Sequence, residues 1–194
     1  MPSQTRDRIL DTTAELFRRQ GYSATGMKQI AAEAAAPFGS LYHFFPGGKE
    51  DLGAHTILTS GRLYTRMFAE IAMQAPDMLS AVAAFFSGAA ETLVETGYAD
   101  ACPIATVALE VSSTNEQLRL ATAEVFTEWI DGASAWFGSA GIAPERSREL
   151  AFVMLNLLEG AFVFARSLRS TEPLEHAGRA AVGEVARALE EAGA

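Results

Sequence analysis

Side chains that commonly carry out catalysis or bind metals are few and scattered in this sequence. The three histidines, His43, His55 and His176, lie far apart, and the chain has no His-Glu-x-x-His motif, nucleophile elbow or phosphate-binding glycine loop. The single cysteine, Cys102, cannot form an internal disulfide and has no cysteine neighbour with which to build a zinc site. We therefore expect no enzyme activity, no metal and no cofactor. A redox role for Cys102 is less favoured than simple burial, because apolar residues follow it and no cation is adjacent.

The distribution of charge favours a DNA-binding N-terminus more than the total charge does. The chain has a formal net charge of −9, but residues 1–50 contain six basic and five acidic side chains, a balance of +1. The remaining residues therefore carry −10. An acidic body repels phosphate, whereas a nearly neutral N-terminal segment can approach it, so the pattern suits an orientation-specific DNA-binding protein. The negative charge of residues 51–194 is explained equally well by acidic side chains that simply keep the helix surfaces solvated.

The composition is typical of a soluble globular protein. The 194 residues are 49% hydrophobic and 20% charged, which provides enough apolar side chains for a substantial core. No uninterrupted apolar run reaches the roughly 20 residues of a membrane span, and the N-terminus from Met1 to Arg8 is polar. These features predict a cytoplasmic protein without a membrane partner.

Apolar residues recur at helical spacing almost throughout, which predicts an all-α fold. The first of three short N-terminal helices ends near Gly21, the side chain of Thr25 caps the second, and Pro37 begins the third. Leu41 and Phe45, four residues apart, point inward from the third helix. The apolar stripe of the first helix consists of Ile9, Leu10, Thr13, Leu16 and Phe17. This arrangement predicts a helix-turn-helix, whose second helix can enter the major groove of DNA.

The body of the chain is predicted to form a bundle of about six further helices, about nine in all. Turn signals that separate them occur at Pro76, Gly97, 112–113, 141–144 and 170–173. Their apolar stripes include Met78, Val82, Phe85, Phe86, Ala89 and Leu93 on one helix, and Leu118, Val125, Phe126, Trp129, Ala133 and Phe137 on another.

Several segments resemble the TetR family of transcriptional regulators. Thr25-Gly-Met-Lys-Gln-Ile-Ala-Ala-Glu-Ala and Gly39-Ser-Leu-Tyr-His-Phe-Phe-Pro-Gly-Gly-Lys-Glu are similar to the family's DNA-binding signature. Ala101-Cys-Pro-Ile-Ala-Thr-Val-Ala-Leu-Glu, Leu158-Glu-Gly-Ala and Arg169-Ser-Thr-Glu-Pro-Leu resemble its LmrA/YxaF-like branch. The resemblance spans nearly the whole chain. It implies a repressor that leaves a palindromic operator when a small molecule binds its body.

The resemblance also implies a domain division and a set of DNA contacts. Residues 1–48 would form the helix-turn-helix domain, and residues 49–194 the ligand-binding and dimerisation domain. The Tyr42 hydroxyl would reach a phosphate or a base edge, and the Lys49 ammonium would bind a phosphate at a helix N-terminus. The full set of implied DNA-binding residues is Thr25, Lys28, Phe38, Gly39, Ser40, Tyr42, His43 and Lys49.

Three residues of the predicted DNA-binding segment depart from the family pattern. Ala35 replaces the glycine of the turn, so a left-handed backbone there would cost about 1 kcal/mol. Phe38 stands at a position that is often polar in relatives, and Phe44 replaces a histidine. We expect both rings to be able to lie exposed. Phe38 would then pack on thymine methyl groups in the groove, although covering the turn is an alternative role.

The resemblance places a ligand cavity and a dimer interface in the body. Aromatic and methionine stripes fit an ordinary core equally well, but the family's cavity lies among its fourth to eighth helices. Candidates for the cavity wall are Met67, Phe68, Phe85, Phe86, Leu109, Phe126, Trp129 and Phe152. Few charged groups fall on these stripes, which favours an uncharged, partly aromatic effector. Candidates for the homodimer interface are Leu157, Gly160, Ala161, Phe164, Ala177, Ala181 and Val185.

Two other classes of protein fit the sequence less well. An all-helical enzyme would need one of the catalytic motifs that are missing here. A protein-interaction module would explain the helices but not Tyr42 and Lys49 at the family's spacing.

Overall fold

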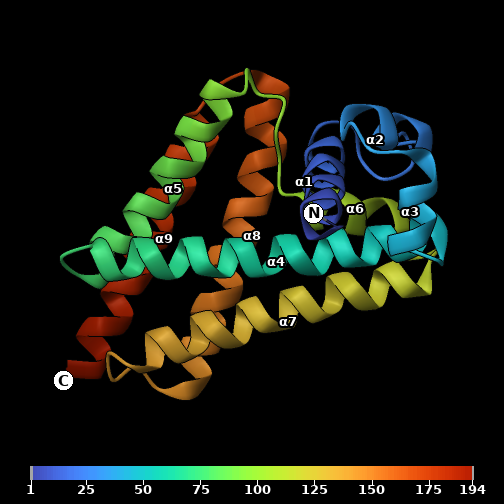
Figure 1. Cartoon of the computed structure of the whole chain (residues 1–194). Helices are drawn as coiled ribbons and strands as arrows, with labels where there is room; N and C mark the ends of the chain where they lie inside the picture. Colours follow the sequence, from blue (N-terminus) through green and yellow to red (C-terminus); the bar gives the residue numbers. More distant parts are fainter. Residues whose placement is uncertain (1, 194) are drawn as a thin grey trace. The chain divides into compact units, whose positions relative to one another are not determined.

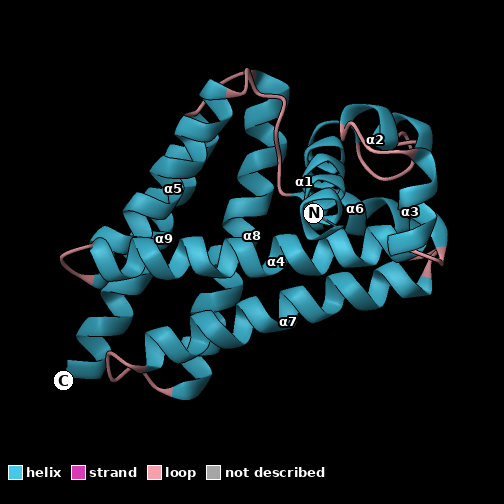
Figure 2. Cartoon of the chain, in the orientation of Figure 1, coloured by secondary structure: helices cyan, strands magenta, loops and turns pink. Residues whose placement is uncertain are grey.

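The computed structural model describes the backbone of residues 2–193 and the side chains of residues 4–193. Within these residues the chain forms nine helices and no strand, so the all-α prediction is confirmed (Figures 1 and 2). The helices are α1 (Pro2–Gln20), α2 (Met27–Glu33), α3 (Phe38–Phe44), α4 (Gly48–Gln74), α5 (Met78–Glu95), α6 (Pro103–Val111), α7 (Glu116–Gly138), α8 (Pro144–Leu168) and α9 (Glu172–Gly193).

The chain divides into two compact units. The first comprises Met1–Tyr64 and Asp100–Val125, and the second comprises Thr65–Ala99 and Phe126–Ala194. Helices α4 and α7 each contribute residues to both units. The predicted boundary after residue 48 coincides with the start of α4, within the first unit. That functional division stays a prediction.

The core of the first unit joins α1, α2 and α3 to the start of α4. Its buried members are Ile9, Leu10, Leu16, Ile30, Ala31, Ala34, Leu41, Phe45 and Leu52. The predicted stripe of α1 is buried throughout, and Leu41 and Phe45 are fully buried as expected. Gly21 has φ +78°, the left-handed conformation that glycine adopts without steric cost at the end of a helix.

The structure corrects two predicted helix starts. Thr25 does not cap α2: the N-cap is Gly26, which makes no side-chain hydrogen bond. Thr25 is fully buried, and its hydroxyl donates instead to the Gly21 carbonyl at 2.6 Å. Threonine can bond backward to a carbonyl four residues earlier as readily as forward to an amide. Pro37 is the N-cap of α3 rather than its first residue, which is Phe38.

In the second unit, α9 packs against both α5 and α8. The shared core consists mainly of Val82, Phe86, Ala90 and Leu93 from α5, Leu150, Met154, Leu158 and Ala161 from α8, and Leu174, Ala177, Ala181 and Val185 from α9. A Cβ on Gly178 would lie 2.9 Å from Cβ of Phe86, so a glycine there permits the close approach of α9 to α5. Small residues of α8 and α9 therefore fill this unit's own core.

Two helices of the second unit are long and apolar enough by composition to cross a membrane. Their mean hydropathy reaches 1.3 in α5 and 1.5 in α8 over an 18-residue window. Both contribute buried side chains to the core described above, and core helices of soluble proteins pass the same test. We interpret them as core helices.

Candidate DNA-binding site

Helix α3 presents a pair of aromatic rings to solvent. Leu41 and Phe45 anchor the opposite face of the helix, because both are completely buried. Phe38 and Tyr42, one turn apart, are 43% and 48% exposed, and their rings meet edge to face with centroids 5.6 Å apart. The exposed face can therefore offer an apolar ring edge and a phenolic hydroxyl to one partner.

Polar groups surround this aromatic pair on the same short helix. His43 is exposed and its ring contacts Phe44 at 5.0 Å, while Ser40 is half-buried and Gly39 is exposed. Phe44 is half-buried and packs against the core of the first unit, so the expectation that both unusual rings lie exposed holds only for Phe38. Phe44 therefore helps to cover the core of the first unit.

The turn between α2 and α3 has the left-handed residue that the family pattern implies. Ala35 has φ +45°, and the amide of the next residue, Ala36, donates to the Ala31 carbonyl at 2.9 Å. This bond closes the end of α2, but the Cβ of Ala35 opposes the backbone conformation by about 1 kcal/mol. The left-handed conformation is thus kept at this turn although the residue is alanine.

Lys49, in the first turn of α4, is held beside the turn between α1 and α2. Its Nζ lies 4.2 Å from the centroid of the Tyr22 ring and donates to the Ser23 carbonyl at 3.5 Å. Burial lowers the pKa of Lys49 below its usual value. The nearby Glu110 carboxylate favours the charged ammonium and so opposes part of this shift. The ring and the carbonyl thus give the ammonium a defined place.

The structure brings Tyr42 close to the start of α4. A Cβ on Gly48 would lie 3.7 Å from Cε1 of Tyr42, so the Tyr42 ring and the residue before Lys49 are neighbours. Lys28 is exposed on α2, where a polar partner can reach it. Thr25 is the exception among the eight proposed contacts, because its buried side chain cannot touch DNA.

Two carboxylates from distant parts of the chain contact this region, and sequence reasoning missed both. Glu110 accepts hydrogen bonds from the amides of Tyr22 and Ser23, at 3.0 and 2.8 Å. Asp100 accepts from Arg18 Nε at 3.0 Å. Their partners lie more than eighty residues away, so no local spacing could have revealed them.

In the second unit, three of the proposed cavity residues come together. The Phe68 ring meets both Phe85 and Trp136 edge to face at 5.2 Å, and Phe85 meets Phe86 at 6.0 Å. Trp136 was not among the predicted residues, although it lies one position from the predicted stripe on α7. Phe126 and Trp129 form a separate pair at 5.9 Å.

Two of the predicted cavity residues, Leu109 and Phe152, have exposed side chains that do not point into a core, and their place in a ligand cavity stays a prediction. Leu109 is 83% exposed on α6, whose opposite face buries Ile104 and Val107. Phe152 is 43% exposed, with the Arg148 guanidinium 5.6 Å from its ring. Met67 is also 40% exposed.

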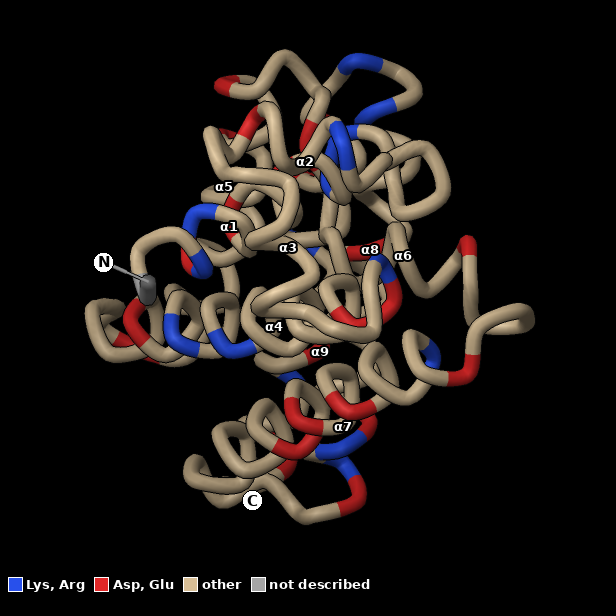
Figure 3. The backbone as a smooth tube through the Cα atoms, turned by 45° about the vertical axis from the view of Figure 1, so that its right-hand side comes forward, with Lys and Arg blue, Asp and Glu red and all other residues tan. Residues whose placement is uncertain are grey.

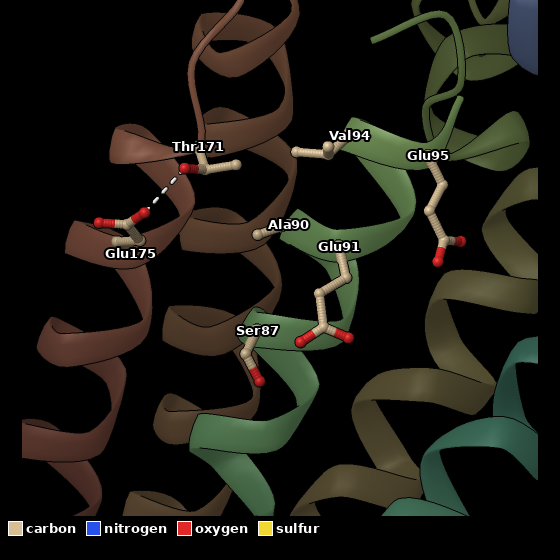
Figure 4. A pocket seen from close by; sticks show the side chains of 7 residues that line it. All are labelled: Ser87, Ala90, Glu91, Val94, Glu95, Thr171 and Glu175. Atoms are coloured by element: carbon tan, nitrogen blue, oxygen red, sulfur yellow. Dashed lines mark hydrogen bonds between the residues drawn. The ribbon is translucent and has the colours of Figure 1, made fainter. Parts of the chain in front are cut away.

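Two open hollows lie between α5 and α9. The first is lined by Ser87, Ala90, Glu91, Val94, Glu95, Thr171 and Glu175, and the Thr171 hydroxyl donates to Glu175 within it at 2.7 Å (Figure 4). The second extends over Phe86, Leu174, Gly178 and Val182. Of the predicted cavity residues, Phe86 lines the second hollow and the others line neither.

The proposed dimer residues separate into two groups. Ala161, Ala177, Ala181 and Val185 are at most 7% exposed and pack in their own unit's core, and their assignment to the dimer interface stays a prediction. Gly160 is exposed, Phe164 is 62% exposed and Leu157 is half-buried. Val163 and Leu168, which were not among the predicted interface residues, extend this exposed apolar surface of α8.

Family models match both parts of the chain. Residues 9–55 match the model for bacterial regulatory proteins of the tetR family. Residues 79–180, more than half of the chain, match the model for the C-terminal domain of LmrA/YxaF-like transcriptional regulators. The chain therefore belongs to the TetR family of transcriptional regulators, in its LmrA/YxaF-like branch.

Individual relatives agree with this assignment over most of their length. The uncharacterized regulator YxaF of Bacillus subtilis is 31% identical, over 88% of this chain and 89% of that protein. LmrA of the same organism is 30% identical, over 89% and 92%. A TetR regulator from Rhodobacter sphaeroides has the same fold, with a TM-score of 0.81 at 21% identity over 92% of this chain and 97% of that one. These relatives are transcriptional regulators rather than enzymes.

Proposed function

We propose that this protein is a repressor that binds a palindromic operator as a homodimer and leaves it when a small, largely apolar molecule binds. The observation that carries the proposal is the exposed pair Phe38 and Tyr42, presented by a helix with two fully buried anchors beside the start of α4. Operator binding, dimers and small-molecule effectors are typical of the family.

In this proposal α3 lies in the major groove. The Tyr42 hydroxyl and Lys49 ammonium bind backbone phosphates and set the docking angle, while Phe38 packs on thymine methyl groups. Lys28 contacts the phosphates on the other flank. Ser40 and His43 supply further polar contacts, and Gly39 lets the DNA backbone approach closely. The Thr25 side chain takes no part, since it is buried.

The homodimer would form through the exposed apolar surface of α8. Phe164, Val163 and Leu168 are each more than half exposed, and Gly160 lets another helix approach closely. Two recognition helices about one DNA turn apart require a roughly palindromic operator.

The effector site we propose lies near the rings of Phe68, Phe85 and Trp136. A partly aromatic, uncharged molecule suits these rings, because edge-to-face contacts favour aromatic ligands. Helix α4 is continuous from Lys49 to Phe68 and so connects the proposed DNA contact with the proposed site. The effector can weaken operator binding by no more than the ratio of its affinities for the released and the DNA-bound conformations of the protein. We place this activity in the cytoplasm, where the operator is.

Selection of bound sequences from random duplex DNA tests the DNA-binding part. The wild-type protein should enrich a palindrome, and the double variant Tyr42→Ala with Lys49→Ala should not. A matched control replaces Arg62 and Leu63 by alanine, which removes an exposed cation and an exposed large apolar side chain from α4 at a distance along the helix from Lys49. A palindrome retained by the double variant would exclude the proposed contacts.

A second experiment tests the release by ligand. Aromatic, uncharged compounds are screened by thermal shift, and each binder is added to the protein on its operator. The expected result is loss of DNA binding with at least one binder. Compounds that bind the protein tightly but all leave operator affinity unchanged would contradict ligand-responsive repression.

A further inference from the structure

Glu110 occupies an anion-binding arrangement in the first unit. It is the penultimate residue of α6, and its two carboxylate oxygens accept hydrogen bonds from successive amides, those of Tyr22 and Ser23. Gly21 precedes these amides with φ +78°. Successive amides after a left-handed residue converge on one point and form a concave site for an anion. Glu110 supplies that anion from a distant helix.

The sequence at this turn is matched to the carboxylate. A Cβ on Gly21 would overlap Oε1 of Glu110, so a side chain at this position would displace the carboxylate from the two amides, and the backbone angle independently favours glycine. A glutamate in the last turn of a helix is unfavourable for the helix itself, because the C-terminal end of the helix dipole is negative. The contact with the two amides offsets that cost.

The two residues whose amides bind Glu110 are the same two that hold Lys49. The Tyr22 ring lies 4.2 Å from Nζ of Lys49 and also packs edge to face on Phe17 at 5.6 Å. The Ser23 carbonyl accepts from the same ammonium at 3.5 Å. A shift of this turn would therefore move both groups that define the position of the ammonium.

We propose that Glu110 is a positioning residue for operator binding, which holds the turn at Tyr22 and Ser23 so that Lys49 is in place for a phosphate. The proposal rests on the DNA contact proposed for Lys49. It makes α6 part of the DNA-binding apparatus although α6 itself need not touch DNA. This role requires a side chain at position 110 that is long enough to reach both amides and has two acceptor oxygens. A negative charge at that position is not sufficient.

Operator binding by fluorescence anisotropy, measured over a range of salt concentrations, tests this role. Glu110→Ala should weaken binding by about tenfold, as expected for losing charge-assisted bonds that order a phosphate contact. Glu110→Asp keeps the charge but is too short to reach both amides, and should weaken binding similarly. Glu110→Gln keeps the length and one acceptor oxygen, and should retain part of the affinity. Glu124→Gln on α7, another exposed glutamate of the first unit, controls for the change in net charge.

A double-mutant cycle separates positioning from a general effect on the fold. Lys49→Ala should reduce the salt slope by about one, and Glu110→Ala should reduce it in the same way. The double variant should bind no more weakly than Lys49→Ala, because Glu110 has nothing left to position. Additive losses, wild-type binding by Glu110→Ala or full activity of Glu110→Asp would each overturn the role of Glu110. If Lys49→Ala itself bound normally, the proposed phosphate contact would fail as well.

Discussion

Exposed apolar side chains occur in both units, but in different settings. In the first unit, Phe38 and Tyr42 stand on a seven-residue helix beside the start of α4, among polar groups. In the second, Val163, Phe164 and Leu168 form a run on the 25-residue helix α8. An aromatic pair among polar groups suits a partner that offers both polar and apolar groups in a groove, such as DNA, whereas an apolar run suits another apolar surface.

Acidic side chains are distributed differently along the chain. Along α7, which contributes to both units, the acidic positions outnumber the basic ones, as the tube drawing shows (Figure 3), and two of them, Glu116 and Asp131, form ion pairs with arginines. In the first unit, Glu110 and Asp100 are bound to amides and to Arg18 near the DNA-binding segment. These two carboxylates are thus held by protein groups, which limits their repulsion of phosphate.

The largest expected effect is on the anchor of the exposed aromatic pair. Phe45→Ala should lower the free energy of unfolding by about 3–5 kcal/mol, because Phe45 is completely buried and its removal leaves a cavity beneath α3. Urea unfolding followed by circular dichroism measures the change. Phe38→Ala, at a 43% exposed ring, should change stability little but weaken operator binding. Equal destabilisation by the two variants would show that Phe38 is a packing residue.

The next largest effect concerns the apolar surface of α8. Phe164→Asp should raise the dissociation constant of the proposed homodimer by about thirtyfold or more, as expected when an exposed aromatic side chain that the dimer would bury is replaced by a charge. Sedimentation at several concentrations measures it. Val94→Asp is a matched control, since Val94 is 54% exposed on α5 of the same unit. Unchanged association by Phe164→Asp would remove this face from the proposed dimer.

Most of the DNA-binding segment could be predicted from local sequence. Leu41 and Phe45, four apart, fix the inward face of a short helix, and this leaves Phe38 and Tyr42 outward. The exception was Thr25, where one hydroxyl could serve two equally common local bonds. Glu110 could not be predicted, because its partners are main-chain amides, which carry no residue-type signal, in a turn far away in sequence.

The interior of the second unit was harder to predict from the sequence. Helical periodicity marks the apolar face of a helix but does not say whether that face meets its own chain or a second copy. Alanines such as Ala177 and Ala181 permit close packing in both cases. The approach of α9 to α5 at Gly178 assigns them to the unit's own core, which only the packed structure could show.

A smaller effect is expected from relieving strain in the turn before α3. Ala35→Gly should raise the free energy of unfolding by up to about 1 kcal/mol, because glycine adopts the observed φ of +45° without steric conflict. Thermal unfolding should show a rise of a few degrees. A lower unfolding temperature would mean that the Cβ of Ala35 makes contacts worth more than the strain.

The smallest effect is expected at the corresponding residue of the second unit. Arg169, the C-cap of α8, also has a left-handed backbone, with φ +52°. Unlike Ala35, it contributes a side-chain bond: its guanidinium donates to the Gly97 carbonyl at 2.5 Å. Arg169→Gly therefore relieves strain but removes a hydrogen bond of comparable value, so the net change should be within about 0.5 kcal/mol. Arg169→Ala keeps the strain and loses the bond, and should be the less stable variant in the same thermal assay. If both variants had equal stability, backbone strain at this cap would be negligible, and the gain expected from Ala35→Gly would have to come from another source.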